Sequence, residues 1–150
     1  EETVTVKGKH YPISRLRGYP KPVQQPLPMM MGASRPRMLR LAAREMDIIS
    51  LGGGPGTPSP TEKRDIIRET AGARYDQIEL NQLLLRVQVD GKPELPTTGP
   101  FANAPALNGS VDQICDELLK RREETDVSYF AIFGPAVEAF APVVARLAGK

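Results

Sequence analysis

The 150-residue sequence contains no tryptophan, one cysteine and one histidine. The single cysteine, Cys115, excludes an internal disulfide and fits a reducing compartment, so we expect a cytoplasmic protein. The single histidine, His10, lies near the start of the chain, before the serine and aspartate residues that a catalytic triad would need in their usual order. The sequence therefore holds neither the Ser/His/Asp arrangement of a hydrolase nor a His/Cys spacing that would bind a metal. These patterns assign no catalytic residue.

Strong charge of one sign and long apolar runs are also missing. The 20 basic and 18 acidic residues leave a net charge of +2, which argues against a nucleic-acid binder that relies on a basic face. No apolar run is long enough to span a bilayer, and no signal-peptide pattern is present. We therefore expect neither a nucleic-acid partner nor a membrane partner. The chain begins at Glu1 without a methionine, and we expect a processed, trimmed or truncated product.

Proline and glycine are plentiful, with 15 and 13 residues, and they divide the chain. Alternating apolar residues on either side of Gly8 predict a small β-hairpin. Prolines at positions 20, 22, 26 and 28 then predict an extended linker. We expect residues 1–27 to form the hairpin and the proline-rich linker, and residues 28–150 to form the folded domain.

The stretch Leu27–Leu51 organises the rest of the domain. An apolar run, Met29–Met31, meets Gly32-Ala33-Ser34, a helical pattern covers Pro36–Met46, and a second apolar run covers Ile48–Leu51. Two short apolar runs joined by one helix are typical of a parallel crossover unit. The face of this helix that we expect to be buried carries Met38, Leu41, Ala42 and Met46.

The turn between the first strand and its helix is a candidate anion site. A glycine and a small residue let the backbone approach a ligand, and Pro36 suits the first helical turn because its missing N–H costs nothing there. The free N–H groups and the positive dipole end of the helix attract an anion, and Arg35 and Arg37 add charge beside them. The alternative is a purely structural turn in which Ser34 caps the helix.

The remaining sequence predicts three more strand-and-helix units. The glycine-rich segment Gly52–Gly56 predicts a loop that lines a pocket, and it lacks the lysine and spacing of a Walker loop. Ser59 and Ser110 each begin a capping box, which predicts helices that end near Gly72 and Thr125.

Two further strands alternate with these helices. Ile78–Val89 predicts one strand, Asp90–Asn108 a loop, and Val127–Phe133 the last strand, which a final helix follows. The side of the Ile78–Val89 strand that we expect to face a polar lumen carries Gln82, Arg86 and Gln88.

Five segments that are spread over most of the chain are read together: GKHY at Gly8–Tyr11, PKPVQQPLPMMMG at Pro20–Gly32, RMLRLAAREMDII at Arg37–Ile49, GSVDQICDELLKRREETDVSYF at Gly109–Phe130 and EAFAPVVARLAG at Glu138–Gly149. In this order and spacing they resemble the C-terminal half of a luciferase-like monooxygenase, in the actinobacterial branch that uses a deazaflavin. The resemblance implies an α/β fold, the C-terminal half of a TIM-type (β/α)8 barrel. Its four parallel strands and their helices follow the small hairpin.

The resemblance also implies a cofactor. Full-length relatives are oxidoreductases or monooxygenases that bind deazaflavin coenzyme F-420, or FMN as the alternative, across the carboxyl ends of the strands. In the family the loop after the first of these four strands contacts the phosphate end of the cofactor. That implies cofactor binding at Gly32, Ala33, Ser34 and Arg35.

Family residues that meet the cofactor ring and the substrate come mainly from the first half of the barrel. The resemblance therefore implies a chain that is catalytically incomplete alone. Two alternatives stay open. One is a non-catalytic half-barrel that forms a homo-oligomer or pairs with a separate N-terminal half, because open strand edges seek partners. The other is a small domain in which the turn is purely structural.

Overall fold

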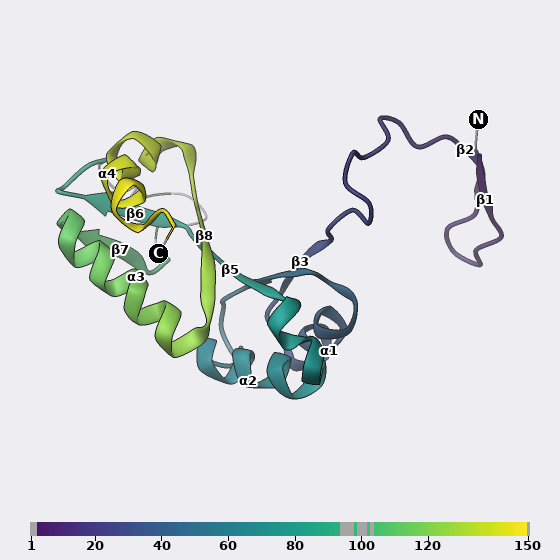
Figure 1. Cartoon of the computed structure of the whole chain (residues 1–150), viewed down its shortest axis with the longest axis horizontal. Coiled ribbons are helices and arrows are strands. Elements are labelled where there is room, and N and C mark those ends of the chain that lie inside the picture. Colours follow the sequence, from purple (N-terminus) through teal and green to yellow (C-terminus); the bar gives the residue numbers. More distant parts are fainter. Residues whose placement is uncertain (1–2, 94–97, 99–101, 103, 150) are drawn as a thin grey trace.

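The computed structural model describes residues 3–93, 98, 102 and 104–149. Its centre is a parallel four-stranded sheet in the order β3 (Met30–Ala33), β4 (Ile48–Leu51), β5 (Glu79–Leu84) and β8 (Val127–Ile132). The helices that alternate with these strands are α1 (Pro36–Glu45), α2 (Pro60–Ala71), α3 (Val111–Thr125) and α4 (Val137–Leu147) (Figure 1). Short 3-10 helices, η1 (Gly72–Gln77) and η2 (Gly134–Ala136), lie after α2 and before α4. The predicted α/β fold with four parallel strands is confirmed.

The N-terminal hairpin is also confirmed. Strands β1 (Val4–Val6) and β2 (Ile13–Leu16) pair antiparallel. Figure 1 shows the hairpin at the far end of an extended segment, away from the four-stranded sheet. Val4 and Leu16 are each 53% exposed. A two-stranded hairpin is marginally stable by itself in water, so these apolar side chains contribute little to the fold as described.

Capping boxes fix the starts of α2 and α3. The Ser59 side chain accepts a hydrogen bond from the Glu62 backbone N–H (3.2 Å), and the Glu62 carboxylate accepts one from the Ser59 N–H (2.7 Å). Ser110 and Gln113 repeat this arrangement at 3.3 and 2.9 Å. Both boxes were expected from the sequence because they depend only on residues three positions apart.

One face of the four-stranded sheet is covered and the other is open. The covered face packs Ala33, Ile49 and Leu80 against α1 and α2, where each is less than 5% exposed: 4, 0 and 1%. The opposite face carries Met30 and Tyr129, which are 50 and 42% exposed. A second apolar cluster lies between α3, α4 and the end of β5. Parallel sheets normally have both faces covered, so the open face is unusual for a complete domain.

The prediction of one strand over Ile78–Val89 is wrong. β5 ends at Leu84, and β6 (Arg86–Val89) pairs in parallel with β7 (Ala106–Gly109) as a separate two-stranded sheet. The apolar run across this break gives no local sign of it. The predicted loop over Asp90–Asn108 is therefore also wrong in its last residues, and its positions 94–97, 99–101 and 103 lie outside the described residues.

The buried face predicted for α1 is partly wrong. Leu39, Ala42 and Ala43 are fully buried, whereas Met38 and Leu41 are 40 and 39% exposed. Arg37, Arg40 and Arg44 lie together on one side of this helix, and Leu39, Ala42 and Ala43 lie opposite them. The prediction therefore chose the flank of the apolar arc instead of its centre. Across the described residues, no helix has the length and apolar character needed to cross a membrane.

Candidate functional site

The four residues predicted to bind a cofactor lie together at the carboxyl end of β3. Gly32 and Ala33 end the strand, Ser34 follows, and Arg35 is the N-cap of α1. A Cβ atom added to Gly32 would meet nothing within 4 Å, so the backbone is open to approach there. Ala33 differs, because its side chain is 4% exposed and belongs to the core. Arg35 is exposed.

The start of α1 has no side-chain cap. The backbone oxygen of Arg35 accepts hydrogen bonds from the N–H groups of Met38 and Leu39, both at 3.0 Å, but no side chain caps the helix. The alternative in which Ser34 caps the helix is therefore wrong. The first turn of α1 also lacks an acidic residue, whereas the first turns of α2 and α3 each have one. The positive end of this helix thus has no anionic side chain of its own.

The glycine-rich loop after β4 lies against this turn. The Gly52 N–H donates to the Ala33 oxygen (2.9 Å), and a Cβ atom on Gly52 would come within 3.3 Å of the Ser34 Cβ. Gly54 has φ +129°, which side-chain-bearing residues rarely adopt, and nothing lies within 4 Å of its Cβ position. Two adjacent loops therefore present open backbone at the carboxyl ends of β3 and β4.

Lys63 is a site residue that the sequence analysis missed. It is 3% exposed, and its Nζ donates to the Gly52 oxygen (2.7 Å) and to Thr57 Oγ1 (3.4 Å). In the described part of the chain, no carboxylate lies within ion-pair distance of this ammonium. Burial lowers the pKa of Lys63, because desolvation disfavours the charged form.

A sequence signal for Lys63 did exist. It precedes Ile67 by four positions on α2, and both side chains are buried on the same helix face. A lysine in the apolar stripe of a helix is seldom fully buried without a specific partner. That partner is a backbone oxygen of another loop, and no local pattern identifies it.

A polar row crosses the open face of the sheet. Gly32, Ser50, Asn81 and Tyr129 are partners in register on successive strands, so they share one face. Ser50 Oγ donates to Asn81 Oδ1 (2.7 Å), and Asn81 Nδ2 donates to the Tyr129 backbone oxygen (3.1 Å). Asn81 is 1% exposed. These bonds tie the middle of the sheet together beside the candidate site.

The lumen-facing role predicted for Gln82 is wrong. Gln82 neighbours Asn81 on β5 and therefore points to the opposite, helix-covered face, where its Oε1 accepts a bond from Arg121 Nη1 of α3 (3.4 Å). Both faces of β5 carry polar residues, so alternation in the sequence could not show which face the helices cover.

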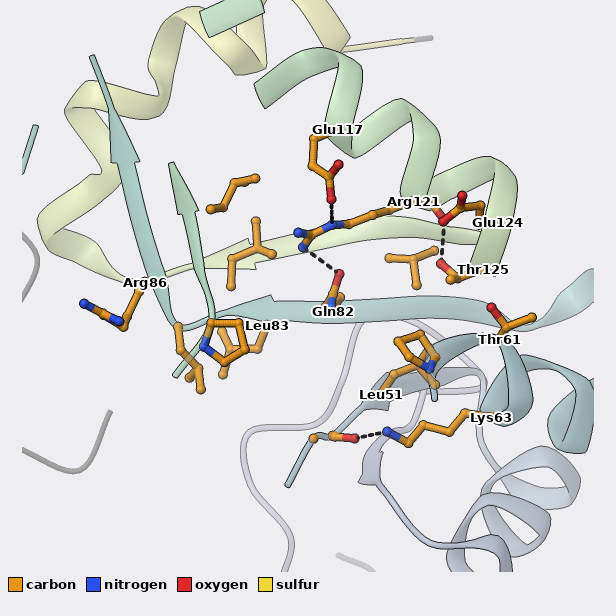
Figure 2. Close-up of a pocket in the computed structure, with 18 of the residues that line it drawn as sticks. Leu51, Thr61, Lys63, Gln82, Leu83, Arg86, Glu117, Arg121, Glu124 and Thr125 are labelled. Carbon is orange, nitrogen blue, oxygen red and sulfur yellow. Dashed lines mark hydrogen bonds and ion pairs between the residues drawn. The ribbon is translucent and has the colours of Figure 1, made fainter. Parts of the chain in front are cut away.

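A cavity of about 450 Å³ lies between α2 and α3, next to the carboxyl ends of β4 and β5. Figure 2 shows Lys63 on one wall and Arg121 on another, with Arg121 between Glu117 and Gln82. The Arg121 Nε donates to Glu117 Oε1 (2.7 Å), so that wall carries a compensated pair of charges. Gly52 and Gly53 also line this cavity, which agrees with the pocket-lining role predicted for their loop.

The described carboxylates, Cys115 and His10 form no second candidate site. Among the described residues, no group of three or more His, Cys, Asp or Glu side chains could hold a metal ion. Cys115 is 6% exposed within the apolar stripe of α3, as the sequence predicts. His10 is exposed in the connection between β1 and β2.

The open turn fits the phosphate end of a flavin-type cofactor. A phosphate needs N–H donors, positive charge and backbone that a side chain does not block. Gly32 leaves the Cβ position empty, α1 has no anionic cap, and Arg35 is exposed at its start. The turn thus offers unblocked backbone, positive charge and the N–H of Arg37, whereas Pro36 has no N–H and that of Met38 already donates to the Arg35 oxygen.

Comparisons with known proteins agree with this architecture. Residues 1–89 match the sequence profile of the family described as luciferase-like monooxygenase. No curated protein matches the chain. Among solved structures, a riboflavin lyase (RcaE) with modified FMN and its substrate riboflavin has a TM-score of 0.69 at 13% identity, over 97% of this chain and 48% of the lyase.

Two other solved structures are similar. An F-420-dependent secondary alcohol dehydrogenase in complex with an F-420–acetone adduct has a TM-score of 0.60 at 16% identity, over 95% of this chain and 56% of that one. The long-chain alkane monooxygenase LadA has a TM-score of 0.67 at 15% identity, over 97% of this chain and 46% of LadA. The chain therefore spans about half the length of these structures, and likeness at this identity shows the fold alone.

Proposed function

This chain belongs to the luciferase-like monooxygenase family, and we propose that it supplies the part of a flavin- or deazaflavin-dependent oxidoreductase barrel that holds the phosphate end of the cofactor. The observation that carries the proposal is the uncapped start of α1 beside the open backbone of Gly32, with Arg35 exposed at the same turn. Two similar structures, described with modified FMN and with F-420, support a cofactor of this class.

The cofactor and the protein have different roles in this proposal. A bound flavin or deazaflavin supplies hydride transfer, and the protein orients it. In this chain the N–H groups and dipole of α1 bind the phosphate, and Arg35 adds a positive charge at the same turn. Deazaflavin F-420 is the first candidate because the sequence segments resemble that branch, and FMN is the alternative. We place the protein in the cytoplasm on the basis of its single cysteine.

Absorbance titration tests the proposal. We expect FMN and the deazaflavin each to show a saturable spectral change with the 150-residue chain, and the tighter of the two to identify the cofactor. A purely structural turn predicts unchanged spectra for both ligands, and that result would reject the proposal.

The same proposal includes a partner, because the barrel is incomplete. In the order of the sheet, β3 and β8 are the outer strands. Large apolar side chains are exposed next to both: Met38 on α1 is 40% exposed, and Val137 and Val144 on α4 are 54 and 53% exposed. We propose that these edges pair with a separate N-terminal half-barrel, or with a second copy of this chain in a homo-oligomer.

Light scattering distinguishes the two partners. A mass near twice that of the chain supports the homo-oligomer, since two four-stranded sheets can close an eight-stranded barrel. A clean monomer at high concentration rejects self-association and leaves the separate half-barrel as the partner to test by mixing.

A further inference from the structure

We infer that Lys63 is a positioning residue for this site: it holds the glycine-rich loop 52–57 so that the loop forms a second wall for a phosphate ester, beside the start of α1. The inference rests on the proposed function and deepens it, because it names a residue and a loop that serve the phosphate group.

A chain of hydrogen bonds joins Lys63 to the turn. Lys63 Nζ donates to the Gly52 oxygen (2.7 Å), and the N–H of the same glycine donates to the Ala33 oxygen (2.9 Å). One residue therefore links the buried ammonium on α2 to the end of β3. If Lys63 is removed, the loop loses the bond that fixes its first peptide next to the candidate site.

The bond from Lys63 also orients the peptide that follows Gly52. The peptide between Gly52 and Gly53 is trans, so its C=O and N–H point in opposite directions. Because the carbonyl of Gly52 points to Lys63, the N–H of Gly53 points away from it. A Cβ atom on Gly53 or Gly54 would meet nothing within 4 Å. The lysine thus fixes the peptide that carries this N–H, and the two glycines have no side chain that could block a ligand.

Lys63 also reaches the far end of the loop. Thr57 Oγ1 donates to the Gly54 oxygen (2.9 Å) and lies 3.4 Å from Lys63 Nζ. The same ammonium therefore contacts residues at both ends of the loop. Glycine at position 54, with φ +129°, makes this tight course accessible to the backbone.

The positive charge of Lys63 favours an anionic ligand at the loop. A buried ammonium is costly unless it is compensated, and no carboxylate lies within ion-pair distance of Lys63 among the described residues. A phosphate dianion held at the loop supplies that compensation. A neutral side chain could fix the loop equally well, but it would not favour a charged ligand.

The experiment compares FMN with riboflavin, which differ only by the phosphate, in flavin fluorescence titrations of the full chain. We expect wild type to bind FMN about 10-fold more tightly than riboflavin, and Lys63→Met to lower this ratio about 5-fold. Lys63→Arg should keep most of the ratio because it keeps the charge. The matched control is Lys120→Met, which removes a lysine whose side chain is 65% exposed on α3, and it should not change the ratio.

The other outcomes overturn either the inference about Lys63 alone or the proposed function as well. A Lys63→Met variant that keeps the wild-type ratio, or that loses both ligands equally, overturns the inference and leaves the proposed function in place. Wild type that binds FMN no more tightly than riboflavin overturns both. If Lys63→Met does not fold, Thr57→Val tests the same loop from its far end: it should lower the ratio about 2-fold, and an unchanged ratio overturns the inference.

Discussion

Arg35 occupies a position where helices usually have serine, threonine, aspartate or asparagine. The side-chain oxygen atoms of such residues accept hydrogen bonds from free N–H groups in the first turn. An arginine cannot accept those bonds, so no side chain occupies the Arg37 N–H as a cap, and the turn gains a positive charge. At this one position, a feature that costs helix stability favours an anionic ligand.

The Arg35→Ala variant tests this residue directly. We expect FMN affinity to fall about 5-fold, because an exposed positive charge near a helix start contributes modestly to phosphate binding. The melting temperature should stay unchanged, because the Arg35 side chain makes no cap bond. Arg40→Ala is the matched control, one turn further along α1 and also exposed. Equal FMN affinity in all three proteins would remove Arg35 from the site.

Tyr75 ties η1 to the turn before β8. Its hydroxyl donates to Asp126 Oδ2 (2.6 Å), which also accepts a bond from Arg68 Nη2 at 2.6 Å. We expect Tyr75→Phe to lower the free energy of unfolding by about 1–2 kcal/mol, measured by urea denaturation at pH 7. The Arg68 guanidinium lies 4.8 Å from the Tyr75 ring centroid, and phenylalanine preserves that contact.

The same variant has a defined pH dependence. Burial, together with the hydrogen bond to Asp126, raises the pKa of Tyr75 above its usual value near 10. A raised pKa means that the stabilisation is fully present below pH 10 and is lost as the pH rises through the folded-state pKa. The stability difference between wild type and Tyr75→Phe should therefore shrink above pH 10. A difference that stays constant to pH 11 would contradict this.

At the residue scale, the sequence predicted the placement of residues that lie close together in the chain. Gly32, Ser34 and Arg35 are adjacent, so their joint placement at the end of β3 was predictable. Lys63 and Asn81 were missed because their partners are distant: Lys63 bonds the Gly52 oxygen, and Asn81 bonds Ser50 on the neighbouring strand. Only the fold brings those atoms together.

Among the elements, the helix starts allow a direct comparison. We expect Ser59→Ala and Ser110→Ala each to cost about 1 kcal/mol in urea denaturation, because each removes a side-chain cap. Ser34→Ala should cost less than half of that, since Ser34 does not cap α1. Equal losses in all three variants would mean that Ser34 also stabilises its helix start.

The boundaries of elements were predictable only when local signals set them. Both capping boxes and the start of α1 at Pro36 depend on neighbours in sequence, and all were anticipated. The break at Leu85 between β5 and β6 was not, because β6 leaves the main sheet to pair with β7, whose short sequence buries only Leu107. A distant pairing partner decides that break.

The whole molecule resembles one half of a larger barrel. A parallel sheet with one uncovered face and apolar residues at both edges fits half of a barrel, and the chain spans about half of the similar structures. The sequence predicted four parallel strands because each unit repeats the same order of apolar run, turn and helix. It could not show which apolar side chains stay exposed, because that depends on what covers the open face.

A charge on the open face tests the role of that face. Met30 is 50% exposed there, so Met30→Glu should change the free energy of unfolding by less than about 0.5 kcal/mol. The same change should abolish association with the second half-barrel or second copy, measured by light scattering. Val23→Glu, at a fully exposed position (100%) in the extended segment, is the control and should associate normally. If both variants associate alike, the open face is not the interface.

The central claim, that the rim at β3 and β4 holds the phosphate end of the cofactor, is tested most directly by backbone amide NMR of the full chain during titration with FMN. We expect the largest shifts at Ser34, Arg35 and Arg37 at the start of α1 and at Gly53 and Gly54 in the adjacent loop. Shifts confined to α3 and α4, or no shifts at saturating FMN, would contradict it.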